Sequence, residues 1–360
     1  MATSCWPTMH TPKEGVTERY SSLSSTDGNI SISAVPAVMN YLTSDVEIVH
    51  CHRNLAGSDN ELVGAAWNPT ETQISNARKK EMNLKHNGFE LKKHPISEKA
   101  IDFFDQDDVV ENYYPLCEEL LTEALMVSDI GSDEAPIKNF VVKVFDHNVR
   151  SSKSNERKLK NSSGSVVQTP VAVVHGDYTR VSAPRRIQDL SLTPKRNDVF
   201  RTGTNENGER LPLLDPELVK EATSGKLRYA FINVWRNIRK EEPVRQFPLA
   251  CVDASSVTFD ELRTFQIHYA DRVGENYFAC SSGTDNSRQH EWFYYPQMSI
   301  DEVLLLKQWD SEGGIANGSS CDKGGTSTFS IHSAFLDCTC QDDEADRESI
   351  EVRCVVIWDE

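Results

Sequence analysis

A succession of short apolar runs, rich in Val, Ile, Phe, Tyr and Trp, fills the second half of this 360-residue chain. Strand-length runs separated by turn residues are typical of a β-sandwich or β-barrel. They lie at 227–235, 248–252, 262–269, 276–280, 291–295, 302–306, 328–335 and 350–358. We therefore expect a mainly β fold with flanking helices.

The first half mixes helix and strand patterns. One apolar face predicts a helix at 109–125, in which Pro115 either introduces a kink or marks the true start. We expect a second helix at 97–104 and partly helical structure at 180–190. Strands are expected at 88–91, 140–145 and 166–174, the last of them buried and leading into His175.

We expect one catalytic domain at 33–360, preceded by a disordered Ser/Thr-rich tail at 1–32. Polar stretches near 151–164, 191–215 and 311–326 predict surface insertions, because they contain few apolar residues to bury. The second is long enough to act as a lid over a site.

Charge and cysteine content restrict the partners and the compartment. The formal net charge of −17 opposes binding to phosphate backbones and to anionic membranes, so we expect neither partner. No apolar run is long enough to span a bilayer, and the N-terminal segment has no apolar core of a signal peptide. Nine cysteines without a C-x-x-C pair favour free thiols in a reducing compartment. We therefore expect a cytoplasmic protein.

The only H-x-D sequence in the chain is His175-Gly176-Asp177. Alternate residues of a strand point to the same side, so His175 and Asp177 can face one ion. Two histidines and one carboxylate on one face of iron(II) leave positions for a 2-oxo acid and for oxygen. The tripeptide alone is weak, since about one such match is expected by chance. A core histidine beside a turn aspartate is the structural alternative.

A second histidine and two arginines follow the H-x-D motif. His332 lies in a β-like run and can supply the third metal ligand. Arg347 and Ser349 offer a guanidinium and a hydroxyl for the far carboxylate of a 2-oxo diacid. Arg347 could instead pair with the acidic residues at 342–346, and Arg353 is the other candidate for the clamp.

These residues occur in the order found in the iron(II)/2-oxoglutarate-dependent oxygenases. More specifically, four segments resemble motifs of a family of microbial hydroxylases and desaturases. That family includes relatives of a cephamycin-pathway methoxylation protein and of the fungal gibberellin desaturase. The segments are NVWRNI at 233–238, WFYYPQM at 292–298, DEVLLLK at 301–307 and RESIEVR at 347–353.

The resemblance extends from about residue 88 to the C-terminus, with two departures. Asn237 stands where the family often has proline, and Arg347 lies further from His332 than is usual. A small acidic insertion at 339–346 accounts for the longer spacing and leaves open the choice between Arg347 and Arg353.

The resemblance implies a double-stranded β-helix, a jelly-roll or cupin-like barrel. It implies that His175, Asp177 and His332 hold iron(II), with 2-oxoglutarate and molecular oxygen as co-substrates. The expected reaction removes hydrogen from an unactivated C–H bond of a small molecule in natural-product metabolism. Hydroxylation, desaturation or oxidative ring closure can follow. The most specific expectation is cyclisation of an N-prenylated amino acid of the kainoid type.

Further residues are candidates for binding the 2-oxo acid or the substrate. Asn233 could contact the 2-oxo acid, whereas Arg236 could bind a substrate carboxylate. A carboxylated substrate could also use Arg180 and Arg185. Core packing and internal ion pairs are the structural alternatives for such residues. The remaining candidates for substrate contact are Trp235, Tyr178, His268 and Lys307.

Two other classes of function remain open from the sequence. A non-catalytic jelly-roll protein could bind a small ligand, but it would have no need of all three metal ligands. A zinc hydrolase could use the same three residues, but Arg347 and Ser349 would then have no 2-oxo diacid to bind.

Overall fold

The computed structural model describes residues 32–53, 62–130, 139–153, 167–195, 198–269, 272–281, 289–340 and 345–359, together with Pro7 and residues 9–11. The side chains of 127–130 are outside this description. Most of the expected tail at 1–32 and most of the expected insertion at 151–164 lie outside the described residues.

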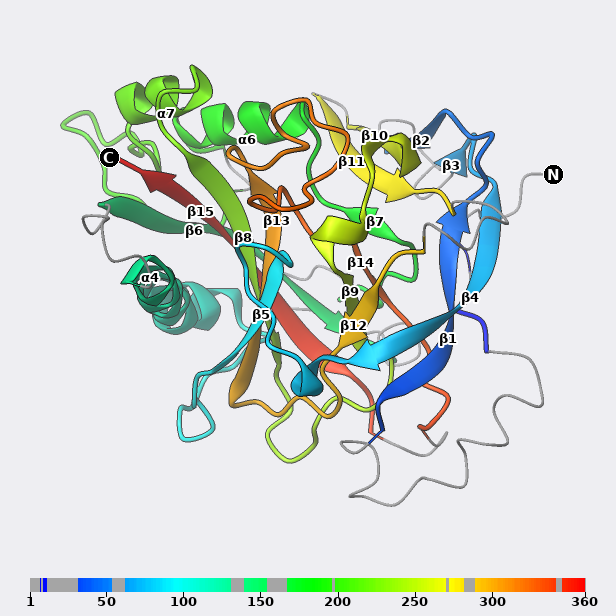
Figure 1. Cartoon of the computed structure of the whole chain (residues 1–360). Coiled ribbons are helices and arrows are strands. Elements are labelled where there is room, and N and C mark those ends of the chain that lie inside the picture. Colours follow the sequence, from blue (N-terminus) through cyan, green and yellow to red (C-terminus); the bar gives the residue numbers. More distant parts are fainter. Residues whose placement is uncertain are drawn as a thin grey trace.

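Two β-sheets make up most of the molecule (Figure 1). The smaller, antiparallel sheet has the order β5-β13-β8-β15-β6. Its strands are β5 (Phe89–Lys93), β6 (Phe140–Ser151), β8 (Tyr229–Asn237), β13 (Glu302–Asp310) and β15 (Glu348–Trp358).

The larger sheet has ten strands in the order β1-β4-β12-β9-β14-β7-β11-β10-β2-β3 and curls strongly (Figure 1). Two of its pairs are parallel, β2 with β10 and β4 with β12. The strands are β1 (Ala34–Leu42), β2 (Ile48–His52), β3 (Leu62–Val63), β4 (Trp67–Asn76), β7 (His175–Gly176), β9 (Leu249–Val252), β10 (Leu262–His268), β11 (Val273–Ala279), β12 (Trp292–Tyr294) and β14 (His332–Ala334).

Helices cover the smaller sheet and the upper rim in the view of Figure 1. A π-helical turn at Val109–Tyr113 leads without a break into α4 (Tyr114–Ile130), so the wide turn lies just before Pro115, which has no N–H to continue the regular hydrogen-bond pattern. The rim carries α6 (Ser182–Leu190) and α7 (Pro216–Thr223). Short helical turns lie at α3 (Gln106–Asp108), η1 (Ala77–Lys79), η3 (Ala254–Ser256) and η4 (Phe259–Glu261).

The expected mainly β fold with flanking helices is confirmed, but two local predictions were wrong and four strands were missed. Residues 97–104 form turns rather than a helix. Residues 167–174 form no strand, and only His175–Gly176 pairs within the sheet. The strands β1 to β4 were not predicted, although β1 and β4 pair along nine positions.

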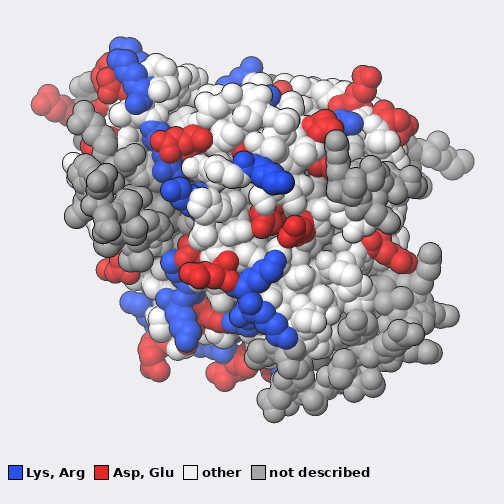
Figure 2. All heavy atoms as spheres, viewed as in Figure 1, with Lys and Arg blue, Asp and Glu red and all other residues white. Residues whose placement is uncertain are grey.

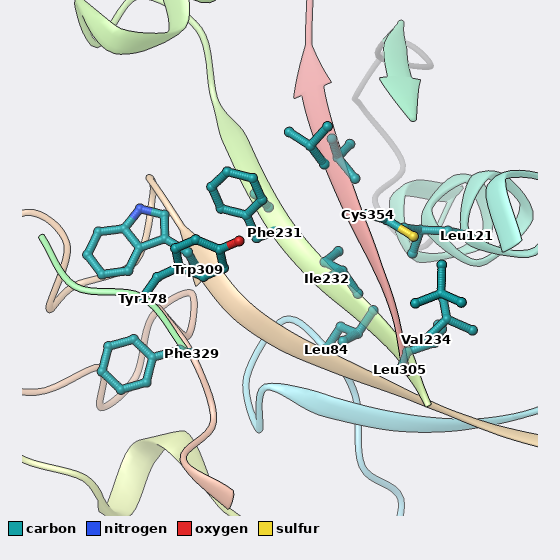
Figure 3. Packing of buried hydrophobic residues seen from close by; sticks show 14 of the residues in the cluster. Leu84, Leu121, Tyr178, Phe231, Ile232, Val234, Leu305, Trp309, Phe329 and Cys354 are labelled. Carbon is teal, nitrogen blue, oxygen red and sulfur yellow. The ribbon is translucent and has the colours of Figure 1, made fainter. Parts of the chain in front are cut away.

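Aromatic and aliphatic side chains fill the space between the layers. Tyr178 stacks on Phe231 with ring centroids 4.4 Å apart, and Trp309 stacks on Phe329 at 6.1 Å (Figure 3). Burying such rings provides a large share of the favourable free energy of folding. This core fixes the strands that carry the polar residues described below.

The surface combines both signs of charge. Figure 2 shows acidic and basic side chains side by side rather than in one continuous field, although acidic residues outnumber basic ones over the chain. No described helix is both long and apolar enough to cross a bilayer. Each of the eight cysteines in the described part of the chain is a free thiol.

Candidate active site

Two neighbouring strands bring together the three expected metal ligands. His332 on β14 stands directly opposite His175 on β7, and the two rings have centroids 4.4 Å apart. Asp177 follows β7 immediately, with its Oδ1 3.7 Å from His175 Nε2. One potential ligand atom from each residue lies within 4.8 Å of the others. The spacing suits a single metal ion once the side chains close around it.

Backbone carbonyls fix the tautomers of both imidazoles. His175 Nδ1 lies 2.7 Å from the carbonyl oxygen of Val173, and His332 Nδ1 lies 3.2 Å from that of Ser330. A carbonyl oxygen only accepts, so each Nδ1 carries the proton. Each Nε2 is therefore left as a lone pair. This orientation of a histidine by a second hydrogen bond is typical of metal ligands.

Burial and local charge favour the ligating protonation states. Burial lowers the pKa of His175 to about 4 and also lowers the pKa of His332. Burial raises the pKa of Asp177, but His332, His175 and Arg353 outweigh it and hold that pKa below its usual value. Neutral imidazoles beside an ionised carboxylate are the forms that bind a divalent cation.

The smaller sheet supports Asp177 through an amide bridge. Asn233 Nδ2 on β8 donates to Asp177 Oδ2 at 3.2 Å and to Glu351 Oε1 at 2.8 Å. The backbone N–H of Asp177 reaches Gln308 Oε1 at 3.3 Å. Burial and the nearby Asp177 raise the pKa of Glu351. Glu351 and Gln308 were not among the expected site residues. Glu351 lies within the motif at 347–353, whereas Gln308 lies in none of the four segments.

The two candidate arginines differ in what they already bind. Arg353 Nη1 pairs with Asp146 at 2.6 Å, and its Nη2 lies 4.0 Å from Glu351. Arg347 is 3% exposed and pairs with no carboxylate among the described residues. Its Nε donates to Ser349 Oγ at 3.2 Å and its Nη1 to the Phe247 carbonyl at 2.5 Å. Of the two candidates, Arg347 is therefore the one that forms no ion pair with a described residue, although Glu351 is near enough to favour its charged form.

A further arginine that the sequence did not indicate lies beside this pair. Arg150 on β6 is opposite Ser349 on β15, and its Nη1 donates to the Thr169 carbonyl at 2.9 Å. Burial and Arg150 together lower the pKa of Arg347 to about 9. Two neighbouring guanidiniums in a buried place create a strong preference for an anionic ligand. Arg150 was overlooked because the expected strand ended at residue 145, before the position that faces Ser349.

Trp235 and Tyr178 lie close to these groups. The guanidinium of Arg347 lies over the Trp235 ring, 5.3 Å from its centroid. Tyr178 follows Asp177 directly and is buried against Phe231. Both side chains can therefore limit the space beside the three ligands.

The other expected substrate contacts are not brought to the three ligands. Arg236 donates to Tyr113 Oη at 2.8 Å on the other face of β8. Lys307 pairs with Asp310 at 2.9 Å. His268 lies at the edge of the larger sheet with two other histidines. The substrate-binding role expected for these three residues stays a prediction without geometric support.

Two comparisons relate the whole chain to known proteins. A family model described as an oxidoreductase/YMDC permease-like domain matches residues 39–203 and 203–357. An uncharacterised protein encoded in the dcmA 3′ region of Methylophilus leisingeri is 33% identical over 213 residues, covering 57% of this chain and 92% of that protein. The hydroxylase/desaturase efuI of Hormonema carpetanum is 28% identical and covers 78% of this chain and 80% of its own.

A third relative has a solved structure. The Fe(II)/2-oxoglutarate-dependent dioxygenase nvfI of Aspergillus novofumigatus is 27% identical over 293 residues, covering 81% of this chain and 84% of that protein. The structure of the endoperoxidase NvfI superposes with a TM-score of 0.62 over 91% of this chain and 98% of that chain, at 20% identity. The likeness confirms the expected double-stranded β-helix fold.

Proposed function

The chain belongs to the family described as an oxidoreductase/YMDC permease-like domain, and from this premise we propose that it is an oxygenase of natural-product metabolism that holds iron(II) through His175, Asp177 and His332. The enzyme class and the two cofactors expected from the sequence, iron(II) and 2-oxoglutarate, are confirmed by the names of its relatives. The specific ligand residues are part of the proposal.

One observation carries the assignment of residues. Two imidazoles with free Nε2 lone pairs stand together with an ionised carboxylate, and a second group, Arg347 with Ser349, has no carboxylate partner among the described residues. The first group fits a divalent iron ion and the second fits the distal carboxylate of 2-oxoglutarate. The difference between the arginines favours Arg347, with Ser349, over Arg353 for that contact.

Each residue has a definite task in this proposal. When bound, iron and 2-oxoglutarate together with oxygen supply the oxidising power that removes hydrogen from a C–H bond. His175, Asp177 and His332 hold the ion, and Asn233 keeps the Asp177 carboxylate oriented through its 3.2 Å hydrogen bond. Arg347 and Ser349 orient the co-substrate, while Trp235 and Tyr178 exclude water.

The two rival functions explain less of this arrangement. A zinc hydrolase would use the three ligands but would leave a buried Arg347 without an anion, at a considerable desolvation cost. A non-catalytic jelly-roll protein would have no reason to hold two histidine tautomers with their Nε2 lone pairs beside an aspartate. The oxygenase gives every one of these groups a partner.

Oxidative ring closure is the finer part of the proposal. Cyclisation of an N-prenylated amino acid stays our most specific prediction, and the solved relative NvfI is named an endoperoxidase, an endoperoxide being itself a ring. Arg236 and Lys307, two cations expected to bind substrate carboxylates, already bind Tyr113 and Asp310. A carboxylate on the substrate would therefore have to use other donors, and Arg150, which interacts with Asp177 and His332, is one candidate.

The decisive experiment records visible spectra under strict anaerobic conditions. Iron(II) and 2-oxoglutarate added to the protein should give a metal-to-ligand charge-transfer band, because the 2-oxo acid chelates the bound ion. The band should be absent in His175→Ala and His332→Ala and retained in His86→Ala, which removes an exposed imidazole elsewhere. If well-folded wild-type protein binds no iron(II), the oxygenase proposal is wrong and the ligand-binding jelly-roll takes its place.

A further inference from the structure

A second group of three histidines lies at the far edge of the larger sheet. His50 and His52 are alternate residues of β2, so they point to the same side. His268 is paired with His52 across the parallel strands β2 and β10. All three side chains are half-buried. They belong to none of the groups that form the active site.

Two of the three imidazoles are close enough to share one ion, and the third would have to move to reach it. His50 Nδ1 and His268 Nε2 are 3.0 Å apart. Two nitrogens that share one zinc ion at about 2.0–2.1 Å are separated by roughly this distance. The His52 ring is stacked on that of His268 with centroids 4.6 Å apart, and lies 6.2 Å from His50. To bring one of its nitrogens to the same ion, the His52 side chain would have to rotate away from the interaction that it already makes.

Strand alternation separates this group from the active site. His175 is paired with Phe278 on β11, and Phe278 is paired with Arg263 on β10. His268 is an odd number of residues from Arg263, so it projects from the opposite face of the sheet to His175. Ile48, on the same face of β2 as His50, is 37% exposed. An ion can therefore reach the histidines from solvent without passing through the active site.

The protonation state also suits a metal. A hydrogen bond between two imidazoles requires that at least one nitrogen of the pair is unprotonated. Partial burial, then His52 and His50, lower the pKa of His268. The group therefore offers nitrogen lone pairs near neutral pH, which is the condition for binding a transition metal.

We propose that His50, His52 and His268 form a second, surface metal site for a divalent cation that prefers imidazole nitrogen, such as zinc(II) or copper(II). A site of nitrogen donors alone favours these ions over iron(II), which lies lower in the affinity order. The edge site would therefore be a poor site for iron(II), whereas the carboxylate-containing site can hold iron(II) and also zinc(II).

Metal binding at this site would also stabilise the pairing of β2 with β10. The strand β2 pairs only with β10 and with the two-residue strand β3, within the described part of the chain. His50 and His268 are 218 residues apart in sequence. A ligand that binds only the folded state raises the free energy of unfolding, so the metal should raise the melting temperature.

The test measures zinc(II) binding by calorimetry on chelator-treated, full-length protein without a histidine tag. We expect two tight zinc equivalents in the wild type, one in His332→Ala and one in His268→Ala. The site that remains in His332→Ala should weaken about 100-fold or more when His268→Ala is added, since a direct ligand is removed. His86→Ala is the matched control and should keep both equivalents.

Copper(II) provides a second measurement that does not depend on the folding of a His268 variant. Titrated into His332→Ala, one copper(II) equivalent should give an electron paramagnetic resonance spectrum with coupling to several imidazole nitrogens. The inference is overturned if that coupling is missing, or if zinc binding is equally weak with and without His268. Loss of the equivalent that depends on His332 alone would instead count against the proposed oxygenase site.

Discussion

The two faces of β8 use one short sequence for two different purposes. On one face, Asn233 bridges Asp177 and Glu351, and Trp235 lies under the guanidinium of Arg347. On the other face, Arg236 donates to Tyr113 and to the backbone of His94. Strand alternation alone separates the two sets.

The buried arginines on the two faces, Arg236 and Arg347, differ in how many of their nitrogens have hydrogen-bond partners. Arg236 is fully buried and its donors reach the Tyr113 hydroxyl, the carbonyls of His94 and Ile300 and the imidazole of His94. Arg347 is nearly as buried, yet its Nη2 makes no hydrogen bond to a described residue. A buried arginine whose three nitrogens all have partners holds the fold, whereas one that has a nitrogen without a described partner is suited to a ligand.

The largest expected effect is on co-substrate binding. Arg347→Met should raise the dissociation constant for 2-oxoglutarate by about two to three orders of magnitude, because one partner of a buried charge pair is lost. The intensity of the charge-transfer band during an anaerobic titration measures this constant. Arg353→Met is the matched comparison. If Arg353→Met weakens the binding of 2-oxoglutarate more than Arg347→Met does, then Arg353 and not Arg347 binds the distal carboxylate.

The next largest effect is on stability, from the opposite face. Arg236→Met should lower the free energy of unfolding by about 2–4 kcal/mol, because buried carbonyls and the Tyr113 hydroxyl lose their donor. Urea unfolding measures the change. Arg201→Met, which removes an exposed arginine from surface ion pairs, should cost less than about 1 kcal/mol. A substrate-binding role for Arg236 would show instead as a higher KM with unchanged stability.

The sequence predicted those site residues whose proximity follows from their spacing along one strand. The alternation of His175 and Asp177 is a property of adjacent residues, and the β-like run around His332 was visible as a stretch of apolar side chains. Arg347, directly before β15, and Ser349, its second residue, are likewise alternate residues of the chain. Such spacing is independent of how the rest of the chain folds.

The contacts that join separate strands could not be predicted in this way. Arg150 faces Ser349 only because β6 continues to Ser151, where polar residues concealed the strand. Glu351 reaches Asn233 through the register between β15 and β8. The strands at 34–76 were missed because their sequence alternates too weakly, and pairing with each other gives them their strand structure.

A smaller effect should follow from replacing Asn233. Asn233→Leu removes the amide that orients the Asp177 carboxylate, so iron(II) affinity should fall about 10- to 100-fold. Binding of 2-oxoglutarate to the fully iron-loaded protein should change little, because Arg347 and Ser349 are retained. An anaerobic iron(II) titration separates the two quantities. A fall in 2-oxoglutarate affinity alone would mean that Asn233 contacts the co-substrate instead.

The smallest expected effect is a pH dependence of stability on the Arg236 face. Burial, then Arg236, lower the pKa of His94 to about 4, because a protonated ring would place an N–H against the guanidinium. An unfolded histidine has a pKa of about 6.5, so the unfolded state takes up more protons between these values. Stability is therefore lost as the pH falls through about 6.5 toward 4, by about 1 kcal/mol from this residue once its partial exposure is allowed for.

The difference between wild type and His94→Gln in urea unfolding at pH 7 and at about pH 5 isolates this contribution from that of the other histidines. Equal pH slopes in the two proteins would mean that His94 is protonated beside Arg236, and the contrast between the two faces of β8 would then rest on Arg347 and Asn233 alone.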